Sequence, residues 1–327
     1  MEHDFRKPGA GEMKDEMPGK EGAGEWEFGD PGILILNKPR GPSSHQVTAW
    51  VGEILGTSHV GHSGTLDPMV SGVLVVMLGN AVRLAPLLLQ EEKEYICLAR
   101  LHGDAARDEI QRVAKEFTGR IYQRPPVRSA VARSLRIRTI HELEILDVEG
   151  RLILMRVRCD AGTYLRSLCH DMGLALGTGG QMVELHRSRS GPFAVDDACT
   201  LHELKDAAVL AEAGDMSLIR KFILPVEAAV LPLPRVIIRD TAVDAICHGA
   251  SLACPGILSC EGEFRKGDLI AVMTRKEELV CLGEALVARK TCLPGGTGLV
   301  VASRTVFMKP GTYPRGWKAH PRESPPG

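Results

Sequence analysis

The chain has 327 residues, of which 44% are hydrophobic, 4% are aromatic and 25% are charged, and its formal net charge is −1. This length favours two domains, and the composition is that of a soluble globular protein with a mostly aliphatic core. Charges interrupt every apolar stretch before 18 residues and no signal peptide leads the chain, so we expect a cytoplasmic protein with no membrane partner.

The net charge is unevenly distributed. Residues 1–30 carry nine acidic and four basic groups, so the remainder of the chain holds a net charge of +4. Six arginines then follow one another with no acidic residue between them: Arg120, Arg124, Arg128, Arg133, Arg136 and Arg138. Such a cluster is typical of phosphate binding, although a solvated helix or hairpin face has the same composition.

Taken in chain order, residues 1–31 predict an acidic, flexible N-terminal tail, because they are rich in Gly and charge and poor in branched apolar residues. From Gly32 onward, short apolar segments alternate with Gly and Pro turns. The spacing of apolar residues predicts strands over 73–78 and 152–159 and helices over 47–55, 166–176 and 200–213. Because these elements lack a βαβ rhythm, we expect an α+β fold around a mixed β-sheet over about 32–230.

Prolines at 225, 232 and 234 predict a connection to a second domain over 235–307, followed by a C-terminal tail over 308–327. The second domain begins with a predicted strand at 235–238. A short predicted helix over 241–248 has Asp240 as its expected N-cap and Gly249 as its end. Further short strands are predicted at 269–272 and 279–285.

Nine cysteines occur without a C-x-x-C pair: Cys97, Cys159, Cys169, Cys199, Cys247, Cys254, Cys260, Cys281 and Cys292. An odd number at irregular spacing predicts buried free thiols in a reducing compartment, not disulfides or a zinc site. His62 and Asp67 also lack the partners of a recognised ligand set, so we expect no metal.

The octet Gly61–Pro68 (G-H-S-G-T-L-D-P) is the most informative segment. Its glycines allow positive φ angles, and Pro68 disfavours the α region for Asp67, so the carboxylate is expected on a loop and open to a ligand. A simple turn in which Asp67 caps the local backbone remains the alternative.

This octet resembles the G-H-x-G-T-L-D-P signature of the pseudouridine synthase family whose simplest members modify the T-loop uridine of transfer RNA. Four further elements appear in the family's order: G-I-L-I-L-N-K-P with G-P-S-S-H (32–45), K-E-Y (93–95), G-T-Y-L-R (162–166) and L-H-R-S-R-S-G-P-F (185–193). In the last element His186 and Ser188 depart from the family's Arg and Thr.

The resemblance implies an isomerisation of uridine that needs no cofactor, with Asp67 as nucleophile. Arg166 would pair with Asp67, and Tyr95 would stack on the base and help to remove the C5 proton. Without the resemblance, Arg166 is equally well a surface arginine and Tyr95 a core aromatic. The remaining implied residues are His62, Leu185, Tyr164 and Lys38 at the substrate pocket, with Tyr164 and Lys38 favoured as its structural supports, and Arg124, Arg128, Arg187 and Gly249 at RNA.

Residues 235–307 resemble a PUA domain, a small RNA-binding β-barrel, through the G-D-L-I-A-V-M-T segment at 267–274. The R-P-P-V-R-S-A-V segment at 124–131 resembles the archaeal, dyskerin-like branch of the family, whose members are catalytic subunits of H/ACA guide-RNA ribonucleoproteins. The implied partners are an H/ACA guide RNA, target rRNA and tRNA, two small accessory proteins and a kink-turn-binding ribosomal-type protein. A stand-alone tRNA T-loop enzyme and a non-catalytic RNA-binding scaffold remain as alternatives.

Overall fold

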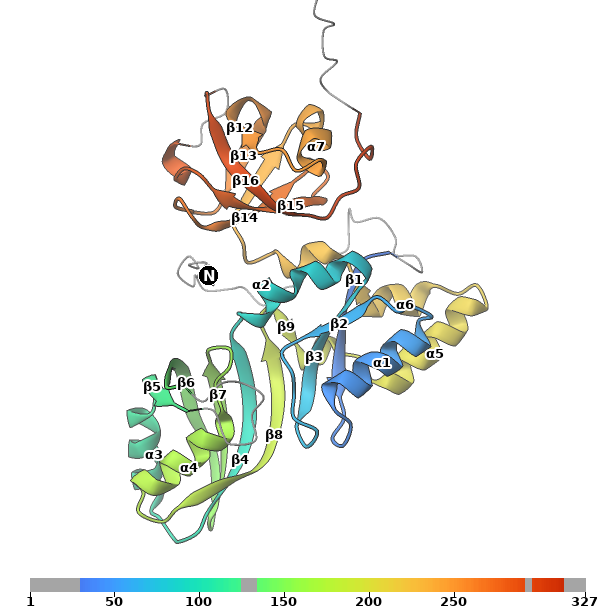
Figure 1. Cartoon of the computed structure of the whole chain (residues 1–327). Coiled ribbons are helices and arrows are strands. Elements are labelled where there is room, and N and C mark those ends of the chain that lie inside the picture. The colour runs from blue at the N-terminus through green and yellow to red at the C-terminus, as the bar shows by residue number, and fades with distance from the viewer. Residues whose placement is uncertain (1–29, 125–133, 292–295, 315–327) are drawn as a thin grey trace, which may run out of the picture. The chain divides into compact units, whose positions relative to one another are not determined.

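The computed structural model of the chain describes residues 30–124, 134–291 and 296–314 (Figure 1). The described residues separate into two compact units, 30–224 and 225–314, which we call the first and second units. The expected N-terminal tail, apart from its last residues, lies outside the described part of the chain. Within the described residues, no helix is long and apolar enough to cross a membrane.

The first unit is built on a mixed sheet of ten strands in the order β10-β1-β3-β8-β4-β7-β6-β5, to which β2 is added on β3 and β9 on β8. Its strands are β1 (Gly32–Lys38), β2 (Val60–Ser63), β3 (Ser71–Leu78), β4 (Lys93–Leu101), β5 (Gly119–Gln123), β6 (Arg136–Glu149), β7 (Leu152–Cys159), β8 (Gly180–Ser190), β9 (Phe193–Ala194) and β10 (Ile223–Leu224). Its helices are α1 (Ser44–Ile54), α2 (Ala85–Leu89), α3 (Arg107–Glu116), α4 (Leu165–Ala175), α5 (Leu201–Glu212) and α6 (Ser217–Phe222).

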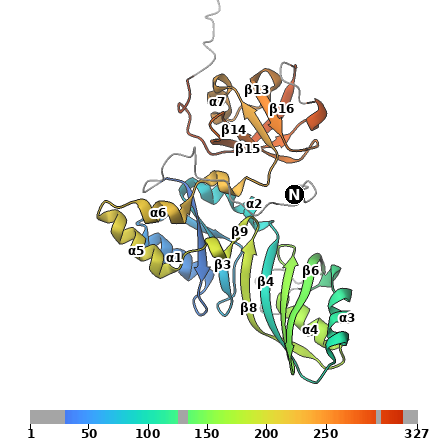
Figure 2. The ribbon, with the colours of Figure 1, turned by 180° about the vertical axis from the view of Figure 1, so that it is seen from behind.

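Two hydrophobic clusters hold this sheet together. Helices α3 and α4 pack on β4 and β7 in one cluster, whereas α1, α5 and α6 pack on β1 and β3 in the other. Figures 1 and 2 show this division from opposite sides. The two halves meet where β3 and β8 pair in parallel through Ser71 with His186 and Gly72 with Arg187. The halves are therefore joined at the strand that follows the G-T-L-D-P loop.

The predicted elements of this unit are confirmed. Strand 152–159 coincides with β7, and the predicted helices match α1, α4 and α5 to within a few residues at each end. The start of α5 is set by a capping box at its N-terminus. The Thr200 hydroxyl accepts from the Glu203 backbone N–H, and the Glu203 carboxylate accepts from the Thr200 backbone N–H.

The second unit is a six-stranded mixed sheet in the order β12-β16-β15-β14-β11-β13, with one α-helix. Its elements are β11 (Arg235–Ile238), α7 (Asp240–Cys247), β12 (Leu252–Ala253), β13 (Ile257–Glu261), β14 (Leu269–Met273), β15 (Leu279–Ala285) and β16 (Leu299–Val306). After β16 the chain still packs on this unit, because the Gly311 N–H donates to Asp244 and the Tyr313 hydroxyl to Glu278.

The predicted N-cap of α7 is wrong by one residue. Asp240 is already helical, and Arg239 occupies the N-cap position with extended backbone and no side-chain cap. The Arg239 N–H instead donates to the Gly256 carbonyl, which fixes this residue at the end of β11. Gly249 does end the helix, with a φ of +87° that favours glycine.

Candidate active site

Buried polar side chains bond the backbone of the loop that carries Asp67 and hold it in place. The Ser44 hydroxyl accepts from the Leu66 N–H (2.8 Å) and lies 3.0 Å from the Leu66 carbonyl, and its side chain is completely buried. The Lys38 ammonium donates to the carbonyls of Pro39, Pro42 and Pro68 at 2.7, 2.8 and 3.3 Å. The loop backbone is thus fixed while its carboxylate stays free to point outward.

The Asp67 side chain is 57% exposed and forms an ion pair and hydrogen bond with Arg166, whose side chain is 50% exposed. Arg166 is the second residue of α4, which begins at Leu165 directly after the G-T-Y segment. Asp67 is therefore presented on a loop, as the glycines and proline predicted, and a cation from a distant helix is aimed at it.

Tyr95 lies on β4 as part of the core cluster that includes α3 and α4, and it is only 9% exposed. Burial raises the pKa of its hydroxyl, the nearby Arg187 lowers that pKa through its charge and a hydrogen bond, and the charge of Asp67 raises it. The structure thus combines two alternatives that the sequence left open, since Tyr95 is a core aromatic and also a neighbour of Asp67.

Two of the residues expected at the substrate pocket or at RNA are buried. Lys38 is 0% exposed and bonds the loop carbonyls, in agreement with the support role that the sequence favoured for it. Arg187 is 1% exposed and donates to the carbonyls of Val73 and Gly64, both at 2.7 Å. A guanidinium inside the sheet cannot contact RNA phosphates, so the expected RNA contact of Arg187 is wrong.

His62 lies on β2 beside the loop that carries Asp67. Its ring nitrogens are 3.2 Å from Thr48 Oγ1 and 3.4 Å from Thr65 Oγ1, and the ring packs edge-on against His45 with centroids 4.9 Å apart. Burial, followed by the charges of His45 and Arg187, lowers the pKa of His62. A neutral imidazole is therefore favoured near Asp67.

The remaining predicted residues occupy different places. Tyr164 precedes α4, and its backbone N–H and carbonyl are both bonded by the Gln123 side chain at 3.0 and 3.1 Å. Leu185 is paired with Cys97 across β8 and β4 and packs on the core. Arg124 and Gly249 are exposed, Gly249 in the second unit. Arg128 lies outside the described residues.

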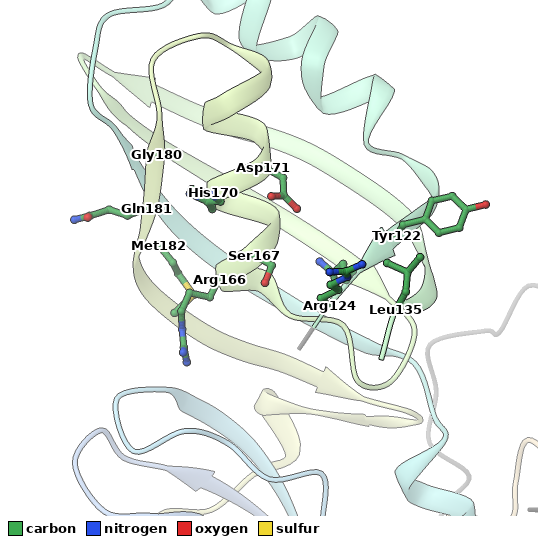
Figure 3. A pocket seen from close by; sticks show the side chains of 11 residues that line it. Tyr122, Arg124, Leu135, Arg166, Ser167, His170, Asp171, Gly180, Gln181 and Met182 are labelled. Carbon is green, nitrogen blue, oxygen red and sulfur yellow. The ribbon is translucent and has the colours of Figure 1, made fainter. Parts of the chain in front are cut away.

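Next to the ion pair is an open cavity of about 740 Å³, lined by residues of α4 and β8, by the end of β5 with the residue after it, and by the residue before β6. The lining residues are Tyr122, Gln123, Arg124, Leu135, Arg166, Ser167, His170, Asp171, Gly180, Gln181 and Met182. In Figure 3, Arg166 extends from the start of α4 away from Arg124 and Asp171. Arg166 is thus shared between this cavity and the pair with Asp67.

The sequence did not assign a role to Ser44, although it lies within the quoted G-P-S-S-H segment. It also gave no reason to expect Arg187 and Lys93 inside the protein. Lys93 is 4% exposed, and its ammonium donates to the Leu88 and Glu91 carbonyls at 3.1 and 2.7 Å. The one sign in the sequence that these residues matter is that each belongs to a segment shared with the family.

Comparison with known proteins agrees with this geometry. Residues 53–165 match the family model described as TruB family pseudouridylate synthase (N terminal domain), 166–231 the tRNA pseudouridylate synthase B C-terminal domain, and 234–304 the PUA domain. The chain is 51% identical over 292 residues to a probable tRNA pseudouridine synthase B of Methanosarcina barkeri, covering 89% of this chain and 86% of the relative. A relative with the same description from Methanocaldococcus jannaschii is 49% identical over 288 residues, with 88% and 86% covered.

Solved structures are similar over the same span. An H/ACA RNP bound to a substrate RNA containing 2′-deoxyuridine contains a chain with a TM-score of 0.83 and 47% identity, covering 88% of both chains. A Cbf5-Nop10-Gar1 complex contains one with a TM-score of 0.81 and 49% identity, covering 88% of this chain and 86% of the other.

The α+β fold and the Asp67 loop are those of an RNA pseudouridine synthase. The chain belongs to the TruB family of these enzymes and carries a PUA domain in its second unit.

Proposed function

We propose that this chain converts specific uridines of RNA to pseudouridine with Asp67 as the nucleophile, and that an H/ACA guide RNA selects the uridines in rRNA. The observation that carries the catalytic part is the Asp67–Arg166 ion pair beside the buried Tyr95. Two charged groups and one phenol are thereby gathered from the β2–β3 loop, α4 and β4.

Each of the three residues has a distinct task in the reaction. Pseudouridine formation breaks the C1′–N1 bond, turns the uracil, joins C5 to C1′ and removes the C5 proton. Asp67 attacks either the uracil ring or C1′, which divides one difficult step into two easier ones. Arg166 pairs with the carboxylate and orients it. Tyr95 contacts the base and receives the C5 proton.

The target uridine must leave its stack to reach Asp67. The exposed Asp67 side chain is accessible to a flipped nucleotide, and His62 lies beside it, where an imidazole could fill the space that the base vacates. Leu185 would line the pocket, with Tyr164 and Lys38 as its supports. Arg124, exposed at the neighbouring cavity, and Arg128 are proposed to bind phosphates, which position RNA without selecting its sequence.

Catalysis and guide-RNA binding would be carried out by different domains. Residues 32–230 would form the catalytic domain and residues 235–307 the PUA domain, which would hold the guide RNA's 3′ end near the exposed Gly249. Support comes from the similarity to chains in an H/ACA RNP and in a Cbf5-Nop10-Gar1 complex. Accordingly, the proposed partners are guide RNA, two small accessory proteins and a kink-turn-binding ribosomal-type protein.

A second candidate function is guide-independent modification of the tRNA T-loop, because curated relatives are described as probable tRNA pseudouridine synthase B. Tritium release from RNA labelled at C5 of uridine distinguishes the candidates. Activity on rRNA that requires the guide supports the H/ACA function, and activity on tRNA without guide supports the second. No release from either RNA, with guide and partners present, would contradict both and leave a non-catalytic scaffold.

A further inference from the structure

Arg187 is a buried cation directly beneath the site. It belongs to β8, is 1% exposed, and its Nε and Nη2 donate to the carbonyls of Val73 and Gly64. Burying a guanidinium is costly unless its N–H groups are bonded, and these bonds offset part of that cost. They do not explain why a cation, instead of an apolar side chain, occupies this position.

The pairing of β4 with β8 supplies a reason. Tyr95 and Arg187 are directly opposite each other in this antiparallel pair, so their side chains share a face of the sheet. Burial raises the pKa of the Tyr95 hydroxyl, and the nearby Arg187 guanidinium lowers it through its charge and hydrogen bonding. The Asp67 carboxylate raises the same pKa. Among these neighbours, Arg187 is the group that stabilises the phenolate.

The same guanidinium reaches the loop of the nucleophile. Gly64 lies in the G-T-L-D-P loop with a φ of +73°, and a Cβ on it would lie 3.3 Å from Arg187 Nη1. The carbonyl of Gly64 accepts from Nη2 at 2.7 Å. One side chain therefore faces Tyr95 across the β4–β8 pair and also bonds the backbone of the loop that carries Asp67.

We infer that Arg187 is a positioning residue, which holds the Tyr95 oxygen and the Asp67 loop in one arrangement so that Tyr95 accepts the C5 proton of uracil. The inference rests on the proposed function, since it deepens the role of the same site. In this step the proton passes from C5 to the Tyr95 phenolate oxygen, the C–H electron pair returns to the ring, and N1 takes up a proton from water.

The test compares Arg187→Met and Arg187→Lys with the wild-type protein on substrate RNA carrying uridine with hydrogen or deuterium at C5. We expect the Met variant to lose at least about tenfold in rate. Its deuterium isotope effect should exceed that of the wild type, because proton removal becomes limiting. Its rate should also rise only at higher pH, since the phenolate has lost the cation that stabilises it.

A purely structural role would lower the rate without changing the isotope effect or the pH profile. The Tyr95→Phe background provides the matched control, in which Arg187→Met should have little further effect on proton removal. If the Met variant does not fold, the Lys variant decides the question, because it keeps the buried charge but lacks the planar fork that bonds two oxygens. It too should then show the larger isotope effect.

The inference would be overturned by a folded variant that keeps the wild-type rate, isotope effect and pH profile. Loss of folding in both variants would also overturn it, because Arg187 would then serve only the core. Failure of the wild-type protein to release C5 hydrogen from any RNA contradicts the proposed function instead. The two failures are therefore distinguishable.

Discussion

Asp67 and Arg166 are 99 residues apart in the chain, yet their side chains form an ion pair at the surface of the first unit. The pair joins the loop before β3 to the first turn of α4. Both side chains are at least half exposed, so the pair contributes little to the free energy of unfolding. Its role is to orient the carboxylate.

Arg166→Met should therefore separate activity from stability. We expect the rate of tritium release to fall by about a hundredfold or more, because an aimed cation at the reacting group is lost. The free energy of unfolding, measured by urea denaturation, should change by no more than about 1 kcal/mol.

Arg156→Met is the matched control for that variant. Arg156 on β7 forms an ion pair with Glu144 at 2.9 Å, and the side chains are 42% and 49% exposed. This substitution should leave tritium release unchanged. Equal activity of the Arg166 and Arg156 variants would show that the Asp67–Arg166 pair is an ordinary surface contact.

Substitutions of Tyr95 should separate its ring from its hydroxyl. Tyr95→Phe keeps the ring in the core and is expected to bind RNA normally but to stall before product release. Tyr95→Leu loses both the ring and the hydroxyl and should be slower still. Single-turnover product formation and RNA affinity are the measurements, and wild-type rates in both variants would reduce Tyr95 to a core residue.

His62 should make stability depend on pH. Its pKa is lowered below the ordinary 6.5 by burial and by the charges of His45 and Arg187, so the unfolded chain binds a proton more readily than the folded one. The contribution of His62 is therefore fully present above pH 6.5 and is lost as the pH falls through the lower, folded value.

The measurement is the urea midpoint of the wild type and of His62→Gln between about pH 7.5 and pH 5, a range that extends at least one unit on either side of the ordinary histidine pKa. On acidification the wild type should lose stability relative to the variant by at most about 1.4 kcal/mol for each pH unit. A constant difference between them across this range would contradict the assignment.

Gly72→Ala should disrupt the junction between β3 and β8. Gly72 has a φ of +105°, and a Cβ there would lie 2.2 Å from the Arg187 carbonyl oxygen. Gly119 has a nearly equal φ of +111° but open space around its Cβ position. Gly119→Ala should cost about 1 kcal/mol from backbone strain alone, and Gly72→Ala clearly more. Equal urea midpoints would show that β8 moves aside without cost.

The sequence predicted the elements of this fold well where local patterns determine them. The buried strand over 73–78, the alternating strand over 152–159 and the helix over 200–213 all carry their own signals in the spacing of apolar residues. The Asp67 loop was also predictable, because Gly64 permits a positive φ and Pro68 disfavours the α region for Asp67.

The tertiary roles of charged residues were not predictable in this way. Lys38, Lys93 and Arg187 are all buried and all bond backbone carbonyls. Charged side chains are mostly found at the surface, so the sequence alone favours exposed positions for these three. Their carbonyl partners can be identified only after β1, β4 and β8 have come together in the fold. The Asp67–Arg166 pair likewise depends on a long-range contact that no local pattern encodes.

The central claim is that Asp67 is the nucleophile, and Asp67→Asn with Asp67→Ala tests it most directly. Because Asp67 is exposed on a loop whose support comes from Ser44 and Lys38, both variants should fold normally. We expect tritium release to be abolished while guide-RNA affinity stays within about threefold of the wild type, or about 0.7 kcal/mol. Turnover close to that of the wild type in either folded variant would contradict the account.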